Sequence, residues 1–238
     1  MKNKLFTLIF SLTTAYAYTQ NLPSASGVSN NIIGHSAFIE AYDHSGQPLT
    51  EVNKKITGTT VLNENWGKGH VVLENGFLLN NVELQFDLFA NELHFRKDSI
   101  AYAFVDALKE FSFEFRDDEL VKTVTFRSGY PAIQKKNGDA FYQVLADGPN
   151  AQFLNYISKE VREDYVYGGP VKKTYKINEV HYIYDAKTGD IRAFNMNKAS
   201  LIKALPAYAG IITTYTAERD LKLKSNADVI ELFKIINR

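Results

Sequence analysis

The feature that most constrains this chain is a series of segments in which apolar and polar residues alternate. The clearest runs from Val82 to Leu88, where apolar residues occupy every second position and Glu83, Gln85 and Asp87 the others. Successive side chains of a β-strand point to opposite faces, so this pattern predicts a strand with one buried and one solvated face. Strands of this kind are typical of antiparallel sheets, whereas parallel sheets use continuous apolar runs.

Similar segments recur from Trp66 to about Asp147 and predict a β-meander. Turn sequences separate them, and Asn75-Gly76 is the strongest because both of its residues tolerate a positive φ. The predicted strands are His70–Glu74, Val82–Leu88, Leu93–Arg96, Ile100–Val105, Phe111–Arg116, Leu120–Arg127 and Ala140–Ala146. Three phenylalanines, Phe111, Phe113 and Phe115, must share one face of their strand.

The regions on either side of the meander carry weaker signals. A strand is possible at Ala37–Tyr42, and Gln152–Glu163 fits either a strand or a short helix. A second hairpin is predicted from Thr174–Asp185 and Asp190–Phe194, joined by a turn at Lys187-Thr188-Gly189.

The C-terminal segment, about 198–238, changes to a helical period. Two apolar stripes have the spacing of one helix face: Leu201, Leu205, Tyr208 and Ile212, then Val229, Leu232, Phe233 and Ile236. Pro206 is expected to end one short helix and begin the next, where its missing N–H costs nothing. Ser225 is expected to cap the last helix, with Asp228 completing a shortened capping box.

These patterns together predict an α+β fold. We expect a curved antiparallel β-meander or half-barrel of about eight to ten strands, closed or covered by the C-terminal helices. Residues 35–238 are expected to form a single domain, with the loop at 129–139 as the place where a second domain would begin.

Residues 1–17 have the three parts of an export signal. Lys2 and Lys4 are followed by a short apolar stretch, and Ala15-Tyr16-Ala17 has the pattern read by a signal peptidase. The apolar stretch is well short of the ~20 residues that a transmembrane helix needs. We expect cleavage after Ala17, a flexible lead at 18–34, and a periplasmic or secreted mature protein without a transmembrane helix.

Composition excludes several classes of protein. Of 238 residues, 45% are apolar and 23% charged, with 27 basic and 27 acidic side chains, which does not fit a disordered chain. The balance of charge gives no general attraction to nucleic acid. The absence of cysteine excludes disulfides, thiolate metal sites, thiol nucleophiles and a thioether-linked lipid anchor.

The search for metal ligands finds one weak candidate. His35, Glu40, Asp43 and His44 offer nitrogen and oxygen ligands within ten residues, but side chains that decorate an exposed hairpin explain them better. The other histidines, His70, His94 and His181, stand singly in predicted strands. His94 lies on the polar side of its strand, so we expect it to be solvated.

The remaining candidates have ordinary structural explanations. The segment Asp185–Asp190 superficially suggests a calcium loop, but it lacks the alternating oxygen ligands, and a hairpin turn explains it better. The carboxylate groups Asp117-Asp118-Glu119 and Glu160, Glu163, Asp164 could serve a glycosidase only if they met other carboxylates in space. Trp66 is expected to pack at a corner of the sheet rather than to stack on a sugar. No catalytic, cofactor-binding or metal-binding residue is therefore assigned.

Several segments of the chain resemble an uncharacterised exported family of Bacteroidetes-type bacteria. The segments are Thr57–Trp66, Gly69–Gly76, Val82–Asp87, Asn91–Phe95, Phe141–Leu145 with Asp147-Gly148, Tyr182–Tyr184 and Asp228–Leu232 with Asn237. The resemblance implies export and carries over no activity.

The functional expectation follows from these points. We expect an exported, non-enzymatic scaffold or binding protein whose partner is unknown and could be an apolar ligand or a protein. The first alternative is a periplasmic carrier of a lipid or other apolar ligand. The second is a secreted glycoside or ester hydrolase with dispersed carboxylates.

Overall fold

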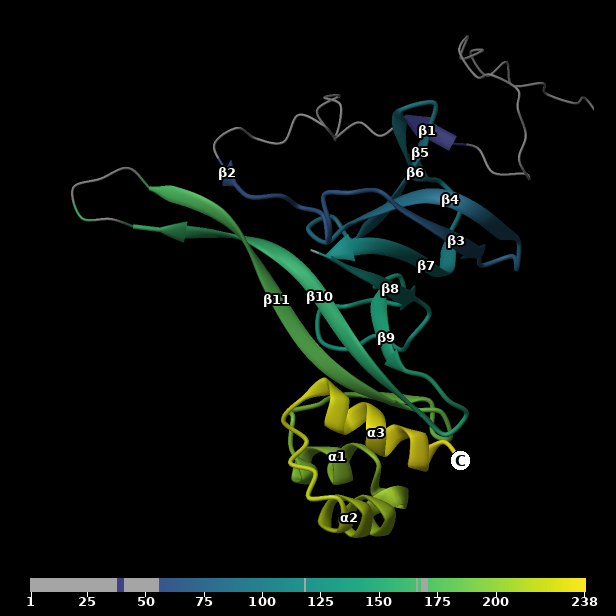
Figure 1. Ribbon diagram of the computed structural model, residues 1–238, viewed down its shortest axis with the longest axis vertical. Coiled ribbons are helices and arrows are strands. Elements are labelled where there is room, and N and C mark those ends of the chain that lie inside the picture. The colour runs from purple at the N-terminus through teal and green to yellow at the C-terminus, as the bar shows by residue number, and fades with distance from the viewer. Residues whose placement is uncertain (1–37, 41–55, 118, 166, 168–170) are drawn as a thin grey trace, which may run out of the picture. The chain divides into compact units, whose positions relative to one another are not determined.

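The computed structural model describes residues 38–40, 56–117, 119–165, 167 and 171–238, which belong to one compact unit that begins at Gly34. Most of them form one 12-stranded sheet followed by helices (Figure 1). The predicted export signal, the lead at 18–34 and the histidine candidates His35 and His44 lie outside the described residues. The strand predicted at Ala37–Tyr42 is confirmed as β1, Phe38–Glu40.

The predicted meander is confirmed in its strands but only in part in the order of those strands within the sheet. After the two-residue strand β2, Ile56–Thr57, it consists of β3 Gly67–Leu73, β4 Leu78–Asp87, β5 Glu92–Lys97, β6 Ile100–Phe104, β7 Leu108–Asp117, β8 Leu120–Arg127 and β9 Tyr142–Ala146. The ambiguous segment is a strand, and the remaining strands are β10 Ala151–Asp164, β11 Lys172–Asp185 and β12 Asp190–Ala193.

The strand order is β1-β6-β5-β4-β3-β7-β8-β9-β10-β11-β12, and every pair along this path is antiparallel. The chain therefore runs outward from β3 to β6 and returns to place β7 on the other side of β3. β2 pairs with β11 and is parallel to it. The sheet is open, because the end strands β1 and β12 do not pair with each other among the described residues.

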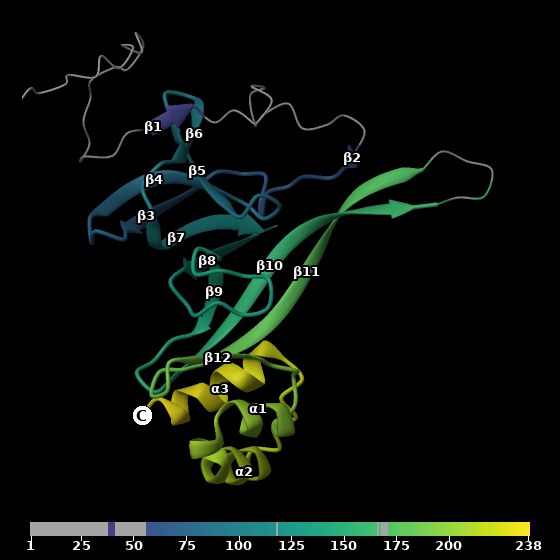
Figure 2. The same cartoon turned by 180° about the vertical axis from the view of Figure 1, so that it is seen from behind.

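The sheet is strongly curved. Although β4 and β10 lie five positions apart in the strand order, the backbone N–H of Lys159 donates to the carbonyl of Leu88, just after β4, at 3.1 Å. The Lys159 ammonium also donates to the carbonyls of Thr59 and Val61, at 2.8 and 2.6 Å. These bonds fasten the middle of β10 beside the end of β4, and Figure 2 shows the long β10–β11 hairpin running from the helices to β2.

Local sequence explains where the strands turn. Gly76 has a φ of +84°, as expected at the second position of the predicted Asn75-Gly76 turn, whereas Asn75 does not have a positive φ; Asp98 and Ser99 both have positive φ between β5 and β6. Gly69 serves a different purpose, since a Cβ there would lie 2.6 Å from that of Phe113 and closer still to the carbonyl oxygen of Ser112. Glycine thus lets β3 approach β7.

The described residues form three apolar clusters. The first lies under β3–β8 and is built on phenylalanine, with Phe111 fully buried and Phe113 2% exposed. The second joins Phe153 of β10 and Ile183 of β11 to the helices. The third is rich in tyrosine and lies under the loop at 129–139, which packs against β9–β11.

The helices are α1 Lys198–Ala204, the 3₁₀ turn η1 Pro206–Tyr208, α2 Ala209–Glu218 and α3 Asn226–Ile236. All eight residues of the two predicted stripes are buried. Pro206 begins η1, and Ser225 caps α3 by accepting a hydrogen bond from the Asp228 N–H at 3.2 Å. Within the described part of the chain, no helix has the length and apolarity to cross a bilayer.

Candidate functional site

His94 does not lie where the sequence suggests. The expectation of a solvated side chain is wrong, because His94 is 6% exposed. Its cross-strand partner Gln85 donates from Nε2 to the carbonyls of Asn63 and Glu64, at 3.2 and 3.0 Å. The segment before β3 therefore covers the face of β5 that the alternation predicts to be exposed to solvent. The central residues of β5 are buried on both faces.

The other histidines do not meet to form a site. His70 is half-buried in β3. His181 lies in β11 with its ring stacked on Phe153, and burial lowers its pKa from the ordinary value. Among the described residues, no three His, Asp or Glu side chains are grouped so as to hold a metal ion. Glu40 and Asp43 belong to a candidate whose side chains lie outside the described residues.

The carboxylate candidates occupy turns and an exposed hairpin. Asp185 and Asp190 flank the predicted turn, in which the Lys187 N–H donates to Asp185 Oδ1 at 2.9 Å. Asp117 and Glu119 flank the β7–β8 turn. Glu160, Glu163 and Asp164 are exposed on β10, where Glu163 pairs with Lys173 at 2.7 Å. These groups therefore lie at two separate turns and on an exposed part of β10, and no catalytic pair is assigned to them.

Trp66 is half-buried just before β3. The guanidinium of Arg96 lies 5.3 Å from the centroid of its ring, and Arg96 is held in turn by Glu83 through two hydrogen bonds of 3.0 Å. One face of the indole is therefore occupied by a cation from the chain itself.

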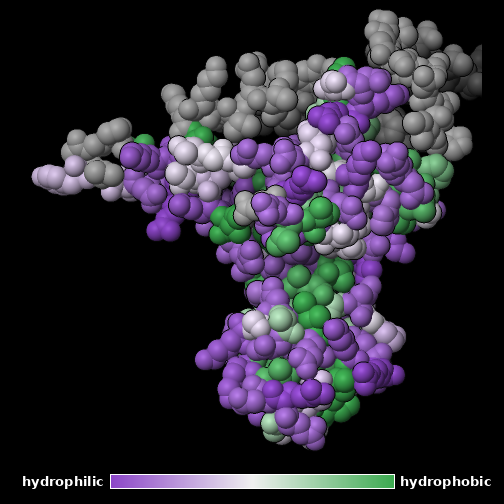
Figure 3. Space-filling model, viewed as in Figure 1, coloured by the Kyte–Doolittle hydropathy of each residue, from purple (hydrophilic) through white to green (hydrophobic). Residues whose placement is uncertain are grey.

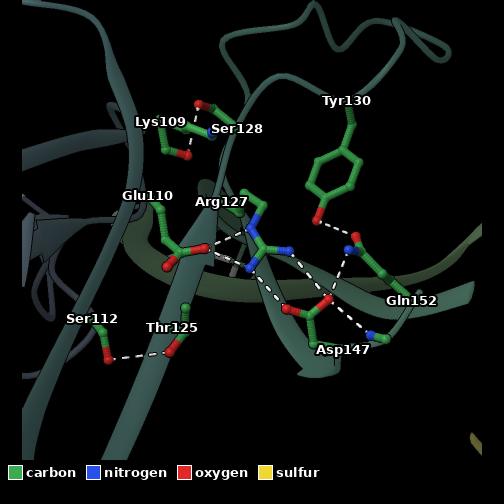
Figure 4. Close-up of polar contacts among 10 residues, drawn as sticks. Lys109, Glu110, Ser112, Thr125, Arg127, Ser128, Tyr130, Asp147 and Gln152 are labelled. Carbon is green, nitrogen blue, oxygen red and sulfur yellow. Dashed lines mark hydrogen bonds and ion pairs between the residues drawn. The ribbon is translucent and has the colours of Figure 1, made fainter. Parts of the chain in front are cut away.

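A polar network surrounds Arg127 in the sheet (Figure 4). The Arg127 guanidinium contacts Glu110 at 2.6 Å and Asp147 at 2.9 Å. Gln152 donates to Asp147 at 2.7 Å and accepts from the hydroxyl of Tyr130 at 2.6 Å. Residues from β7, β8 and β10 and from two loops thus meet at one cation.

The pKa values in this network indicate a structural role. Burial works against the charge of Arg127, but its hydrogen bonds with Asp147 and Glu110 outweigh that effect and raise its pKa. The hydrogen bond from Arg127 lowers the pKa of Asp147, and burial raises that of Tyr130. A carboxylate held in its charged form by a permanent cation is a poor proton donor. The network therefore fastens β8 to β10 rather than moving protons.

Two surface pockets remain as candidates for binding. The larger, about 590 Å³, lies between β12, α1 and Ile133. Its arginine, Arg192, already pairs with Asp190 at 2.9 Å and donates to the carbonyls of Lys203 and Ala204. Arg192 is therefore committed to contacts within the chain, and the lining keeps one other charged side chain, Lys203.

The smaller pocket, about 370 Å³, opens where the ends of β3, β6 and β8 meet the starts of β5 and β7. We call it the acidic pocket. Its apolar lining is Leu93, Phe104, Leu108 and Phe141, and its carboxylates are Glu74, Glu92, Asp106 and Asp139. Neither lysine nor arginine lines it, and among the described residues none of the four carboxylates pairs with one.

Hydrogen bonds between strand ends hold the walls of the acidic pocket. The N–H of Glu74 donates to the carbonyl of Ala107 at 2.9 Å. The hydroxyl of Ser128 donates to the carbonyl of Leu108 at 2.5 Å, and Asn91 Oδ1 accepts from the N–H of Phe141 at 3.3 Å. The pocket walls are therefore built by the fold and do not depend on a single loop.

The chain was compared with protein-family models, curated proteins and solved structures. None matches. The resemblance to an exported bacterial family stays a prediction, and the functional argument depends on the residues and their arrangement.

Sequence reasoning missed the acidic pocket. Glu74, Glu92, Asp106 and Asp139 are spread over the chain, and each reads alone as a polar residue beside a turn. Their positions next to strand ends were the available signal. No local sequence pattern predicts the strand order that brings these ends together, above all the pairing of β7 with β3.

Proposed function

We propose that this chain is an exported, non-enzymatic binding protein. In this proposal the curved sheet acts as a half-barrel scaffold, and the acidic pocket at its strand ends takes the ligand. The three-part pattern of residues 1–17 supports export. The filled interior beneath the sheet supports binding at the surface rather than inside.

The packing of the phenylalanines is the observation that carries the proposal. The ring of Phe86 lies 4.7 Å from that of Phe126 and 5.1 Å from that of Phe111, measured between centroids. Phe141 adds an edge contact with Phe111 at 5.0 Å. Rings at these separations are in direct contact, so the concave side of the sheet holds its own side chains where a carrier would hold its cargo.

The carboxylates also favour binding over hydrolysis. Arg127 brings Glu110 and Asp147 together, because both carboxylates are bound to its guanidinium. A glycosidase needs one carboxyl that can give up a proton, a role that this pairing opposes.

Native mass spectrometry of the purified mature protein tests this function. We expect the mass of the polypeptide alone, with no lipid retained, and no turnover of a panel of glycosides and esters. A lipid bound in stoichiometric amount would favour the carrier. Turnover that is lost on removing one carboxylate would favour the hydrolase.

A further inference from the structure

The acidic pocket combines two kinds of surface. Leu93, Leu108 and Phe141 are at most 9% exposed and provide apolar contact, while carboxylates from four different turns stand around them. A volume of about 370 Å³ lies within the range of small-ligand pockets. A ligand that fits both surfaces needs an apolar body and a positive charge.

The hydrogen-bonding groups at and beside the acidic pocket narrow the choice of ligand. His94 Nε2 makes no hydrogen bond and lies 3.7 Å from Oε2 of the pocket residue Glu92. The partner of His94 on β6, Ala103, also lines the pocket. His94 does not itself line the pocket, so the ligand meets the carboxylates, whose acceptor oxygens suit a group with several N–H donors such as a primary ammonium or a guanidinium.

We propose that the acidic pocket binds an alkyl cation, meaning a primary ammonium or guanidinium carried on an aliphatic stem. The stem lies against Leu93, Leu108 and Phe141, and the charge lies among the carboxylates. This inference deepens the proposed binding function and rests on it. A free amine and a lysine or arginine side chain of a polypeptide share this chemistry.

Titration followed by amide chemical shifts of the mature protein tests the proposal. The probes are hexylammonium, the peptide acetyl-Gly-Lys-Gly-amide, and the isosteres hexanol and hexanoate. We expect both cations to shift the amides of Ala90, Ala103 and Ala107, with binding that weakens as salt rises. Tighter binding of hexylammonium would indicate a free amine as the ligand. Tighter binding of the lysine peptide would indicate a polypeptide side chain.

Substitutions at the rim provide the second test. Asp106→Asn and Glu92→Gln are each expected to weaken hexylammonium binding about 3- to 5-fold, because a partly exposed ion pair contributes up to about 1 kcal/mol. Ala107→Lys adds a cation to the rim at an exposed position and is expected to abolish binding. Glu160→Gln, an exposed carboxylate on β10, is the matched control and is expected to have no effect.

Three outcomes would overturn the proposal: no shift with either cation at 10 mM (about the weakest affinity of interest), hexanol binding as tightly as hexylammonium, or binding unchanged by Ala107→Lys. Each of these leaves the broader binding function standing, because that function fails on different grounds, namely retained lipid or turnover. A folded spectrum for each variant, with unshifted resonances far from the pocket, excludes misfolding as the cause of lost binding.

Discussion

Asn237, next to the C-terminal residue, fastens the helices to the sheet. Its side-chain oxygen accepts from the N–H groups of Asn150 and Ala151, each at 3.0 Å, and its Nδ2 donates to the carbonyl of Ala151 at 2.9 Å. Gly148 leaves room for it, since a Cβ there would overlap the Asn237 amide. One polar side chain thus makes a three-bond clip at the start of β10.

Loss of this clip is expected to be costly. Asn237→Ala leaves two amides and a carbonyl without their partner, so the free energy of unfolding should fall by about 2–3 kcal/mol. Urea denaturation measures this. Asn178→Ala, at an exposed position on β11, should change it by less than about 0.5 kcal/mol. Equal losses of unfolding free energy for the two variants would show that the hydrogen bonds of Asn237 do not stabilise the fold.

His181 makes stability depend on pH. Because burial lowers its pKa, the folded state takes up a proton less readily than the unfolded chain, whose histidine pKa is about 6.5. The unfolded state therefore gains protons first as the pH falls below about 6.5, and stability is lost in that direction.

Replacing His181 by phenylalanine should remove this contribution. The ring can still stack on Phe153 but cannot take a proton. We expect the unfolding free energy of His181→Phe to fall less than that of the unchanged protein between pH 7.5 and 5.5. Parallel curves for the two proteins would contradict the assignment.

Among the elements, α3 has the buried apolar face that the sequence predicts. Its opposite face is less exposed than the sequence predicts. Its stripe is buried as expected. Glu231, on the side that the stripe leaves polar, is however half-buried and accepts a hydrogen bond from the hydroxyl of Tyr215 at 3.1 Å. The reason is that α2 packs beside α3, which the sequence of α3 alone does not reveal.

A charge on the buried face of α3 should unfold or expel the helix. Leu232 is fully buried, so Leu232→Asp is expected to destabilise the protein by more than about 3 kcal/mol. The matched control is Ala227→Asp, which places the same charge at an exposed position in the first turn, where it should change stability by less than about 0.5 kcal/mol. Thermal and urea unfolding measure both, and similar losses would mean that the helix does not pack through this face.

For the whole molecule, export is the prediction that most affects its chemistry. Cleavage after Ala17 removes Lys2 and Lys4 and leaves 25 basic against 27 acidic residues. N-terminal sequencing of the protein recovered outside the cytoplasm should begin at Tyr18, because the small residues Ala15 and Ala17 fit the peptidase. A mature protein that retains Met1 would contradict it.

The sequence alone determined most of the local structure. Alternation and turn residues located the strands from His70 to Ala146, and the cap at Ser225 and the stripe of α3 were read directly, because the strand period, the helix period and capping act over a few residues. The segment of β10 stayed ambiguous because its apolar residues face different clusters: Phe153 packs with the helices and Ile157 with the sheet.

Only the tertiary structure decided what lies over each face and which strand ends meet. His94 was predicted to be solvated because alternation implies a sheet with one solvent-exposed face. In the structure the segment at Asn63 and Glu64 covers that face. The acidic pocket depends on the pairing of β3 with β7, which are separated along the chain by the three strands β4, β5 and β6. Such pairing is set by the burial of the whole set of aromatic side chains at once, a global condition that no single segment of the sequence expresses.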